Sequence, residues 1–327
     1  METIQRYNYL NTYLKEKFGE RTLKICIDGG FTCPNRDGAK GLGGCIFCSE
    51  RGSGDHIKNY NSEANLKTNP MLNSANNDIN KQISSIHNQI KNYFKSYKSE
   101  RANKFIAYFQ NFTNTYDSIE NLKAKYDAAL INNKIVALAI ATRPDCIDEE
   151  KVKLLKSYTD KYYVWVDLGF QTANEKTGKL INRGYSNNDF SRAVQLLNKY
   201  NIDVVTHVMV GLPGEIRSDL EKTIQFINNH NIQGIKIHST YIVENTGLAD
   251  LYKKGIYTPI TLENYLDSVV YILTHINPNI IIHRFSGDAP KEILIAPEWN
   301  THKKWVLNGL NKIMKEQNLF QGMYYKS

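Results

Sequence analysis

The chain has 327 residues, of which 41% are hydrophobic and 23% are charged. This length and composition suit one large α/β domain or two smaller ones and exclude a globally disordered chain. No stretch approaches the ~18 consecutive apolar residues of a membrane span, and residues 1–20 contain no apolar signal core, so we expect a cytoplasmic protein. The net charge of +8 suggests a polyanionic partner.

Short apolar runs alternate with helical patterns along the chain. Strands are expected at residues 23–28, 104–110, 135–141, 162–171, 203–210 and 234–240. Helices are expected between them, near residues 79–98, 118–132, 148–160, 187–200 and 215–229. In the first of these helices, isoleucines at positions 79, 83, 86 and 90 recur every three or four residues, which is the period of an amphipathic helix.

The strand patterns are typical of a parallel sheet. Residues 135–141 read IVALAIA, a continuous apolar run that indicates a strand buried on both faces. Six strand–helix units in series predict an α/β fold, a partial (β/α)6 barrel of the TIM type. In such barrels, functional side chains lie on the loops at the carboxyl ends of the strands.

Two regions depart from this alternation. Residues 53–77 are rich in Asn, Ser, Lys and Gly and are expected to be a surface excursion. After residue 240, the pattern predicts a helix near 261–276, a strand near 280–285 and a helix near 301–317. We therefore predict a core barrel over residues 1–245 and a C-terminal α/β extension over residues 246–327, packed on the barrel.

Three of the five cysteines are grouped after the first strand. Eleven residues separate Cys33 from Cys45, and two separate Cys45 from Cys48. A C-x2-C pair lets two thiolates converge on one metal or cluster, and the intervening glycines let the third approach. The spacing is compatible with structural zinc, with Cys26 as the fourth ligand, and equally with an iron–sulfur cluster. Cys26 and Cys146 are expected to be buried as small apolar residues, and three remaining thiolates suit a four-iron cluster with one open iron.

Further motifs follow in order along the chain. Four of them end or follow predicted strands: ATRPD at 141–145, DLGFQT at 167–172, INRGY at 181–185 and HVMVGLPGE at 207–215. Two more lie near the C-terminus: IHRFSGDAP at 282–290 and LIAPEW at 294–299. Together with the cysteine loop, they resemble the radical S-adenosylmethionine (SAM) superfamily, in its YhcC-type branch and in the related radical SAM domain of the Elongator catalytic subunit. That superfamily usually has C-x3-C-x2-C, and the longer first gap is similar to that of the Elongator catalytic subunit.

The resemblance implies that Cys33, Cys45 and Cys48 hold a [4Fe-4S] cluster and that SAM binds its open iron. One electron, from an external reductant of the flavodoxin or ferredoxin type, would cleave SAM to a 5′-deoxyadenosyl radical, which abstracts a hydrogen atom from the substrate.

The resemblance also implies SAM-binding residues at the strand ends, namely Gln110, Thr113, Arg143, Gln171, Arg183, Gly211, Leu212 and Pro213. The first two end the second strand, where relatives hold the SAM amino group. Arg143 would bind a carboxylate or order its loop. Gln171 would bind the ribose hydroxyls, and Arg183 the methionine carboxylate. The turn at 211–213 would let the backbone approach the adenine.

Other polar and basic residues are candidates for substrate contact. The proposed substrate group is His207, His238, His283, Arg284 and Asp288, although a lone histidine on an apolar strand is more often a hydrogen-bonded core residue. Two basic stretches, 81–104 and 301–327, are interleaved with aromatic residues, a combination that can bind phosphates and stack bases. The candidate RNA contacts there are Lys91, Lys95, Lys98, Arg101, Lys303 and Lys304.

The expected function follows from the resemblance and the charge together. Both indicate tRNA as the partner, with a wobble uridine as the target, and relatives in this branch imply processing of 5-carboxymethylaminomethyluridine to the aminomethyl form. One alternative is a radical SAM enzyme that acts on a small or porphyrin-like molecule. The alternative from another class is a non-catalytic, zinc-stabilised RNA-binding protein.

Overall fold

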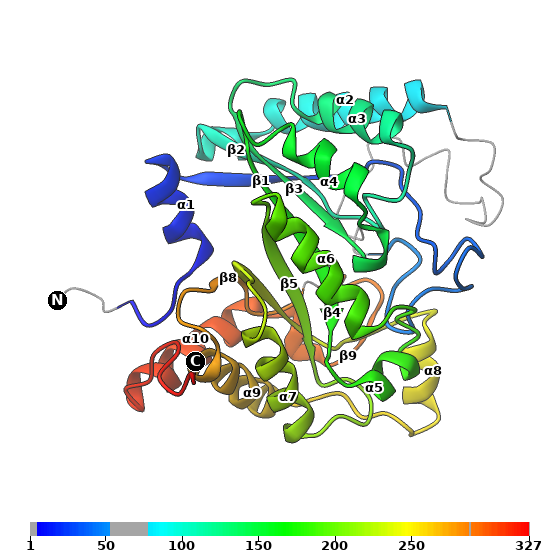
Figure 1. Ribbon diagram of the computed structural model, residues 1–327. Coiled ribbons are helices and arrows are strands. Elements are labelled where there is room, and N and C mark those ends of the chain that lie inside the picture. Colours follow the sequence, from blue (N-terminus) through cyan, green and yellow to red (C-terminus); the bar gives the residue numbers. More distant parts are fainter. Residues whose placement is uncertain (1–4, 53–77, 288, 327) are drawn as a thin grey trace.

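The computed structural model describes residues 5–52, 78–287 and 289–326 (Figure 1). Seven parallel strands pair in the order β1-β2-β3-β4-β5-β6-β8. Their bounds are Thr22–Ile27 (β1), Lys104–Phe109 (β2), Ile135–Thr142 (β3), Tyr163–Gln171 (β4), Asp203–Val210 (β5), Gly234–Ser239 (β6) and Ile281–Arg284 (β8). Because this sheet curls into a half barrel with helices outside it, the predicted α/β partial barrel is confirmed.

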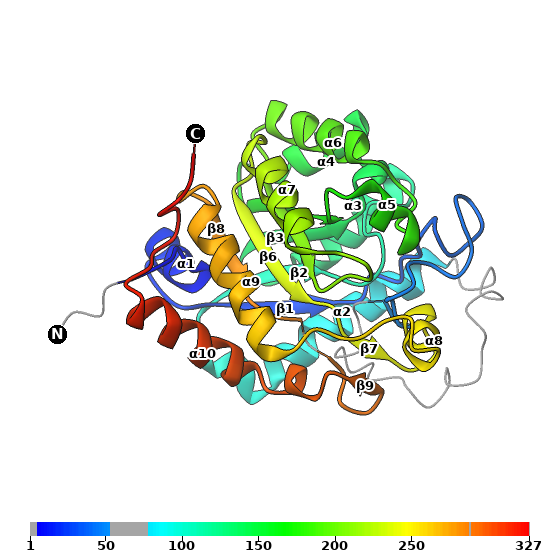
Figure 2. The same ribbon diagram turned by 90° about the horizontal axis from the view of Figure 1, so that it is seen from below.

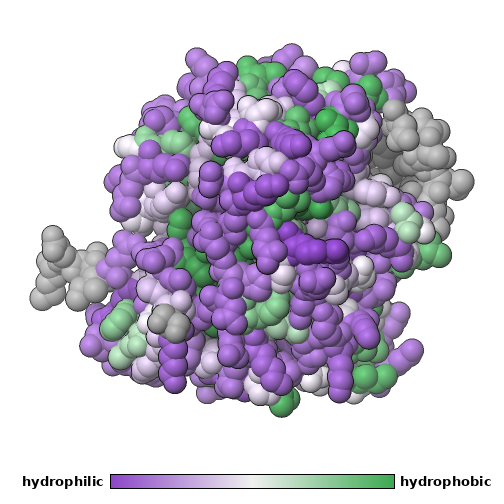
Figure 3. All heavy atoms as spheres, viewed as in Figure 1, coloured by the Kyte–Doolittle hydropathy of each residue, from purple (hydrophilic) through white to green (hydrophobic). Residues whose placement is uncertain are grey.

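Helices between the strands cover the outer face of the sheet. They are α2 (Ile79–Lys95), α3 (Ile119–Ala129), α4 (Glu149–Lys156), α6 (Asn187–Lys199), α7 (Arg217–Asn228) and α9 (Leu262–His275). Ile86 and Ile90 of α2 are buried in the core between sheet and helices, as the isoleucine period predicts. α6 begins at a capping box, in which the Ser186 and Asp189 side chains each accept from the other's backbone N–H. Figure 3 shows that the surface on this side is mostly hydrophilic, so the apolar faces of the helices point inward.

The seventh strand lies beyond the predicted barrel. β8 pairs in parallel with β6, with Gly234 opposite Ile281, and α9 lies between the two strands in sequence. The sheet is therefore continuous across the predicted boundary at residue 245.

The two edges of the sheet are β1 and β8, and the N-terminal helix α1 (Leu10–Phe18) contacts both. The backbone N–H of Ile282 donates to the carbonyl of Asn8 (2.7 Å). Leu10 and Leu14 pack with Trp165 and other inward-facing side chains. Helix α1, which the sequence analysis missed, thus closes the amino-terminal end of the barrel interior.

The remaining elements lie around the carboxyl end of the barrel and along its open edge. They are α5 (Glu175–Leu180), β7 (Ile242–Val243), α8 (Gly247–Lys253), β9 (Leu294–Ala296), α10 (Lys303–Glu316) and the 3-10 helices η2 (Tyr97–Arg101), η3 (Pro144–Cys146) and η4 (Glu298–Thr301). α10 confirms the predicted last helix, whereas α5 and α8 were not predicted. In Figure 2, α10 lies on the side of the sheet opposite α6. Over the described ranges, no helix is long and apolar enough to cross a membrane. The predicted excursion at 53–77 and Asp288 lie outside the described residues.

Candidate active site

The loop after β1 carries the three predicted cluster ligands. It folds into turns in which the N–H of Arg36 donates to the carbonyl of Cys33 (2.8 Å) and the N–H of Cys48 donates to the carbonyl of Cys45 (3.0 Å). Gly44 has a φ of +80°, and a Cβ there would lie 2.8 Å from Nε of Arg36. Glycine is therefore required at this position, for its left-handed backbone and for the close approach of the arginine.

The three loop thiols lie near one another. Burial, with added repulsion from Cys48 and Cys33, raises the pKa of the Cys45 thiol to about 12, while Arg143 opposes the shift. Such repulsion is appreciable only over short distances. Nδ2 of Asn35 lies 3.9 Å from Sγ of Cys45. Three neighbouring thiols beside an arginine fit a [4Fe-4S] cluster, with one iron left open for SAM.

Cys26 does not belong to this group. It was predicted to be a buried apolar residue, but its side chain is exposed. Because Ile25 and Ile27 pack toward the helices, Cys26 faces the barrel interior. Desolvation raises the pKa of its thiol, and the charges that act on it are lysines and an arginine, not the loop thiols. Cys146 is buried, as predicted.

The orientation of Cys26 bears on the zinc alternative, which needs it as the fourth ligand. In the part of the chain that the structure describes, no group of three or more His, Cys, Asp or Glu side chains surrounds a position for a single metal ion. A four-iron cluster does not need such a group, because each thiolate binds a different iron. The donor set therefore fits the iron–sulfur cluster better than structural zinc.

Arg143 ties the end of β3 to the cysteine loop. Its Nε and Nη2 each donate to the carboxylate of Asp145 (both 2.9 Å), and Nη1 donates to the carbonyl of Arg183 (3.0 Å). Nζ of Lys40, in the cysteine loop, donates to the same carboxylate (2.6 Å). Of the two roles predicted for Arg143, this geometry matches the ordering of loops.

Arg183 is placed differently from its prediction. Its side chain is 1% exposed, and all five of its N–H groups have partners within the protein. The acceptors are the carbonyls of Phe170, Thr172 and Tyr185 and the side chains of Glu175 and Asn187. A direct salt bridge to the SAM carboxylate would break these bonds. We therefore correct the role of Arg183 from SAM ligand to a residue that holds the β4–α5 and α5–α6 loops together.

Replacing Arg183 with lysine is expected to lower the free energy of unfolding by about 2 kcal/mol or more, because lysine leaves buried carbonyls unpaired. Arg192→Lys is the matched control, since Arg192 is exposed and only forms an ion pair with Asp189 within α6. Urea denaturation measures both, and the control should change by no more than about 0.5 kcal/mol. Equal stability of the two variants would contradict the structural role.

Gln171 ends β4 in a left-handed conformation, with a φ of +65°. Its Oε1 accepts a hydrogen bond from the hydroxyl of Tyr185 (2.7 Å). A Cβ at Gly169 would lie 2.9 Å from both this tyrosine hydroxyl and Nε2 of Gln171. The glycine thus makes room for the Gln171–Tyr185 pair at the mouth of the barrel. Binding of the SAM ribose by Gln171 stays a prediction.

The end of β2 contains buried polar atoms that lack a partner. Thr113 is 1% exposed, and its Oγ1 has no hydrogen bond; the same holds for Oδ1 of the buried Asn111 and Asn114. Buried polar atoms are normally paired, so orphan acceptors at a strand end indicate a place for a bound donor. The SAM amino group, predicted to lie beside Gln110 and Thr113, is such a donor. The two asparagines were not among the predicted SAM-binding residues, although they belong to the same strand end as Gln110 and Thr113.

The turn after β5 packs against the C-terminal part of the chain. Gly211 has a φ of +85°, its carbonyl accepts from the hydroxyl of Tyr257 (2.6 Å), and a Cβ there would lie 2.9 Å from Ile260. Leu212 is buried, and Pro213 follows it. The turn is thereby fixed at the carboxyl end of β5, where adenine contact is predicted.

An ion pair that the sequence analysis did not single out lies inside the barrel. Nζ of Lys236, on β6, donates to Oδ2 of Asp167, on β4, and to the hydroxyl of Tyr108 (2.8 Å). Nε1 of Trp165 donates to the other oxygen of Asp167 (3.2 Å). Asp167 and Lys236 are almost fully buried. The signal that could have found them is a charged residue inside an otherwise apolar strand.

The predicted substrate residues gather around this pair. Nε2 of His207 lies 3.7 Å from Oδ2 of Asp167, and the rings of His207 and His238 are stacked with centroids 5.3 Å apart. Nδ1 of His283 and Nε2 of His238 are buried without a hydrogen-bond partner. Arg284 acts electrostatically on His238. The structure thus brings four of the five predicted residues together.

The six predicted RNA contacts are all exposed, in two groups. Lys91 and Lys95 lie on α2, with Lys98 and Arg101 on η2 directly after it; the second group, Lys303 and Lys304, begins α10. An exposed aromatic residue stands in each group: Tyr97 is 68% exposed and Trp305 is 51% exposed.

One residue of each group lies near an edge strand of the barrel. The charge of Lys98 acts on Cys26 of β1, and that of Lys303 couples to Arg284 of β8. Since β1 and β8 are the edge strands, the two groups flank the open side of the half barrel.

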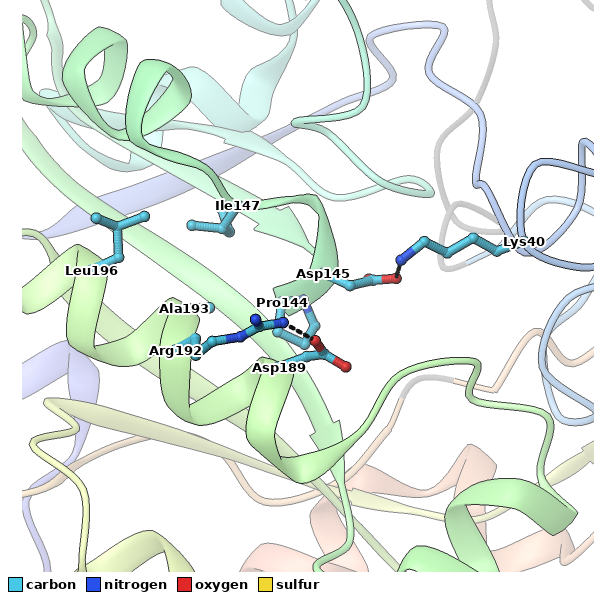
Figure 4. Close-up of a pocket in the computed structure, with 8 residues that line it drawn as sticks. All are labelled: Lys40, Pro144, Asp145, Ile147, Asp189, Arg192, Ala193 and Leu196. Carbon is cyan, nitrogen blue, oxygen red and sulfur yellow. Dashed lines mark hydrogen bonds and ion pairs between the residues drawn. The ribbon is translucent and has the colours of Figure 1, made fainter.

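A separate cavity of about 400 Å³ lies outside the barrel, between η3 and α6 (Figure 4). Ion pairs Lys40–Asp145 and Arg192–Asp189 stand at its walls. None of the predicted SAM or substrate residues lines it, so we do not assign it to the active site.

Comparison with known proteins agrees with this geometry. Residues 33–227 match the radical SAM superfamily, and residues 232–316 match the radical SAM C-terminal domain. The chain is 36% identical to YtqA of Bacillus subtilis, over 99% of this chain and 94% of that protein. It is 31% identical to YhcC of Escherichia coli K12, over 98% of this chain and 96% of that protein.

More distant relatives match part of the chain. A tRNA uridine(34) acetyltransferase of Methanocaldococcus infernus is 29% identical over 50% of this chain and 30% of that protein. The solved structure of the archaeal Elp3 from the same organism, with an N-terminal deletion, has the same fold: the TM-score is 0.61 at 22% identity, covering 73% of this chain and 60% of that one. Membership of the radical SAM superfamily implies a [4Fe-4S] cluster and SAM as cofactors. The chain therefore belongs to the radical SAM superfamily, in the branch that contains YtqA and YhcC.

Proposed function

We propose that this protein modifies tRNA and that its substrate is a wobble uridine, which it converts from the 5-carboxymethylaminomethyl to the aminomethyl form. The observation that carries the proposal is the position of the two basic groups, at the two edge strands of the half barrel. Part of the chain resembles proteins named tRNA uridine(34) acetyltransferase and Elongator complex protein 3, which supports a related substrate.

The open side of the half barrel suits a macromolecule that offers one nucleoside. Lysines and arginines release counterions when they contact phosphates, and exposed aromatic rings stack on bases. Lys98 and Arg101 on one side of the opening, and Lys303 and Lys304 on the other, would hold the phosphates. The nucleoside would then enter the barrel between β1 and β8.

Each part of the barrel has a separate task in this proposal. Cys33, Cys45 and Cys48 hold the cluster, and the Arg143–Asp145–Lys40 network fixes their loop against β3. The cluster and SAM, when bound, would supply a radical that removes a hydrogen atom from the methylene carbon beside the carboxylate, and an external flavodoxin or ferredoxin would supply the electron that starts SAM cleavage. Return of one electron from the substrate radical to the oxidised cluster would leave an imine, which water would hydrolyse to the aminomethyl nucleoside and glyoxylate. Residues of the barrel interior orient the nucleoside beneath the cluster loop.

The nucleosides of tRNA from a deletion strain test this proposal. Mass spectrometry should show accumulation of 5-carboxymethylaminomethyluridine or its 2-thio form, with loss of derivatives built on the aminomethyl group. Complementation with the wild-type gene should restore the profile, and complementation with Cys45→Ser should not. An unchanged nucleoside profile would contradict a tRNA substrate and leave a small-molecule substrate as the alternative.

Reversing the charge of η2 is expected to weaken tRNA binding. The double variant Lys98→Glu/Arg101→Glu should raise the Kd about tenfold or more at physiological salt and reduce the slope of log K against log salt by about 1.5. Lys153→Glu/Lys222→Glu is the matched control with the same change in net charge, because these exposed lysines lie on α4 and α7, on the outer face of the barrel. Filter binding at several salt concentrations measures both. Equal weakening by the control would show that net charge, not the η2 surface, controls binding.

A further inference from the structure

The charges inside the barrel do not balance. Ionisable side chains from six strands meet there: Lys24 and Cys26 of β1, Tyr108 of β2, Asp167 of β4, His207 of β5, Lys236 and His238 of β6, and His283 and Arg284 of β8. Among these residues, Asp167 is the one carboxylate, and three side chains are lysine or arginine.

Both carboxylate oxygens of Asp167 already accept hydrogen bonds. Its Oδ2 accepts from the lysine, and its Oδ1 accepts from Nε1 of Trp165 (3.2 Å). The hydroxyl of Tyr108 accepts a second hydrogen bond from Lys236 (2.8 Å). The pair is therefore neutral as a unit and leaves Lys24 without a counter-ion.

Lys24 lies on the interior face of β1 without a polar partner among the residues that the structure describes. It forms no hydrogen bond or ion pair with another residue of the described ranges, and its Nζ lies 5.4 Å from the ring centroid of Tyr108 and 5.8 Å from that of Trp165. Burial, and then the like charge of Lys236, lower the pKa of Lys24 to about 7. An ammonium held only by aromatic rings is poorly compensated, and an anion beside it would restore the charged form.

Lys24 also lies deep in the barrel. Lys24 is opposite Ile106 in the sheet, whereas Cys26 is opposite Tyr108 and the cysteine loop begins after Ile27. At about 3.3 Å per residue, Lys24 is roughly 10 Å below the start of that loop. A substrate group that reaches Lys24 is thus the end of the molecule farthest from the cluster.

The neighbouring imidazole of His283 offers a further hydrogen-bond donor. The charge of Lys24 acts on His283 and lowers the pKa of its ring, after burial, which holds this histidine neutral. Nδ1 of His283 has no partner. A neutral imidazole and an ammonium together can donate to an oxyanion, which has several lone pairs.

We propose that Lys24 forms an oxyanion-binding site inside the barrel and that this site takes the carboxylate of the substrate's carboxymethyl group. The proposal rests on the proposed function for the identity of the substrate. Such a site would select for the acid: the carboxylate would be held at the bottom of the barrel, with the carbon beside it presented toward the cluster. A phosphate of the nucleotide is the other source of the same chemistry.

The first test compares the acid with its neutral amide. Two tRNAs are used, one with 5-carboxymethylaminomethyluridine and one with the corresponding glycinamide, which has the same phosphates. The wild type should prefer the acid by roughly 10- to 100-fold in kcat/KM. Lys24→Met should lose this preference, and Lys24→Arg should keep most of it, which controls for folding. Equal turnover of acid and amide by the wild type, or an unchanged preference in Lys24→Met, would overturn the carboxylate site.

The second test does not depend on tRNA. Lysines of the reconstituted holoprotein are labelled by reductive 13C-methylation, and the Lys24 resonance is assigned by its absence in Lys24→Arg. Its pKa should lie near 7 without ligand and rise when iminodiacetate is added. A rise with inorganic phosphate alone would assign the site to a phosphate, and no rise with either anion would overturn it. A rise of this pKa with iminodiacetate, combined with an unchanged tRNA nucleoside profile in the deletion strain, would support the Lys24 site and contradict the tRNA function.

Discussion

Replacing Cys45 with serine is expected to abolish binding of the iron–sulfur cluster and all SAM cleavage. Cys45 is the central one of three neighbouring thiols, and two remaining thiolates do not hold a four-iron cluster. Cys26→Ser and Cys146→Ser are the matched controls, because one side chain faces the barrel interior and the other is buried beside Asp145 and is not a predicted ligand. Iron content and absorbance near ~400 nm after anaerobic reconstitution measure all three variants.

Two outcomes would contradict this assignment. Full iron content in Cys45→Ser would remove Cys45 from the ligand set. Loss of iron in Cys26→Ser would restore Cys26 as a ligand and reopen the question of a four-cysteine site.

Removing the charge of Asp167 alone is expected to lower the free energy of unfolding by about 3–5 kcal/mol. Asp167→Asn leaves the ammonium of Lys236 buried in the barrel without a counter-ion. The double variant Asp167→Asn/Lys236→Met should recover most of this loss, because it leaves no unpaired buried charge. Urea denaturation, followed by tryptophan fluorescence, measures the stability of Asp167→Asn, of Lys236→Met and of the double variant, since Trp165 contacts Asp167. A double variant as unstable as the sum of the two single variants would show that the residues do not act as a pair.

The same pair gives the stability a dependence on pH. Burial would raise the pKa of Asp167, but Lys236 and then His207 outweigh it and hold this pKa well below its usual range. Because the folded pKa lies below the unfolded value of about 3.9, the stabilisation is complete above about pH 5 and is lost as the pH falls through the folded pKa. The double variant should lack this component of acid destabilisation.

The sheet could be predicted from sequence because its strands are strongly apolar. The run at 135–141 appears as β3 with a difference of one residue, and the motif at 167–172 lies at the end of β4 as expected. α1 was missed although Leu10, Leu14 and Phe18 have helical spacing, because its packing depends on β8, which is distant in sequence. β8 was recognised as a strand, but its partner β6 could not be identified from the strand itself.

The site was harder to predict for a related reason. Lys24 and Cys26 alternate with Ile25 and Ile27, a pattern that fits a strand with one face in solvent as well as one with a polar interior. Only the curl of the sheet places these side chains beside Lys236. The position of Arg183 in its motif likewise could not reveal that all N–H groups of its guanidinium are paired, because its five partners come from separate short segments.

We propose that a radical SAM reaction in this barrel acts on a tRNA nucleoside. The most direct measurement is a single-turnover assay of the reconstituted protein with SAM, a reductant and tRNA that carries 5-carboxymethylaminomethyluridine. We expect one 5′-deoxyadenosine for each modified nucleoside consumed, with the aminomethyl nucleoside as product and little SAM cleavage without tRNA. SAM cleavage that is independent of tRNA, with the nucleoside unchanged, would contradict the account.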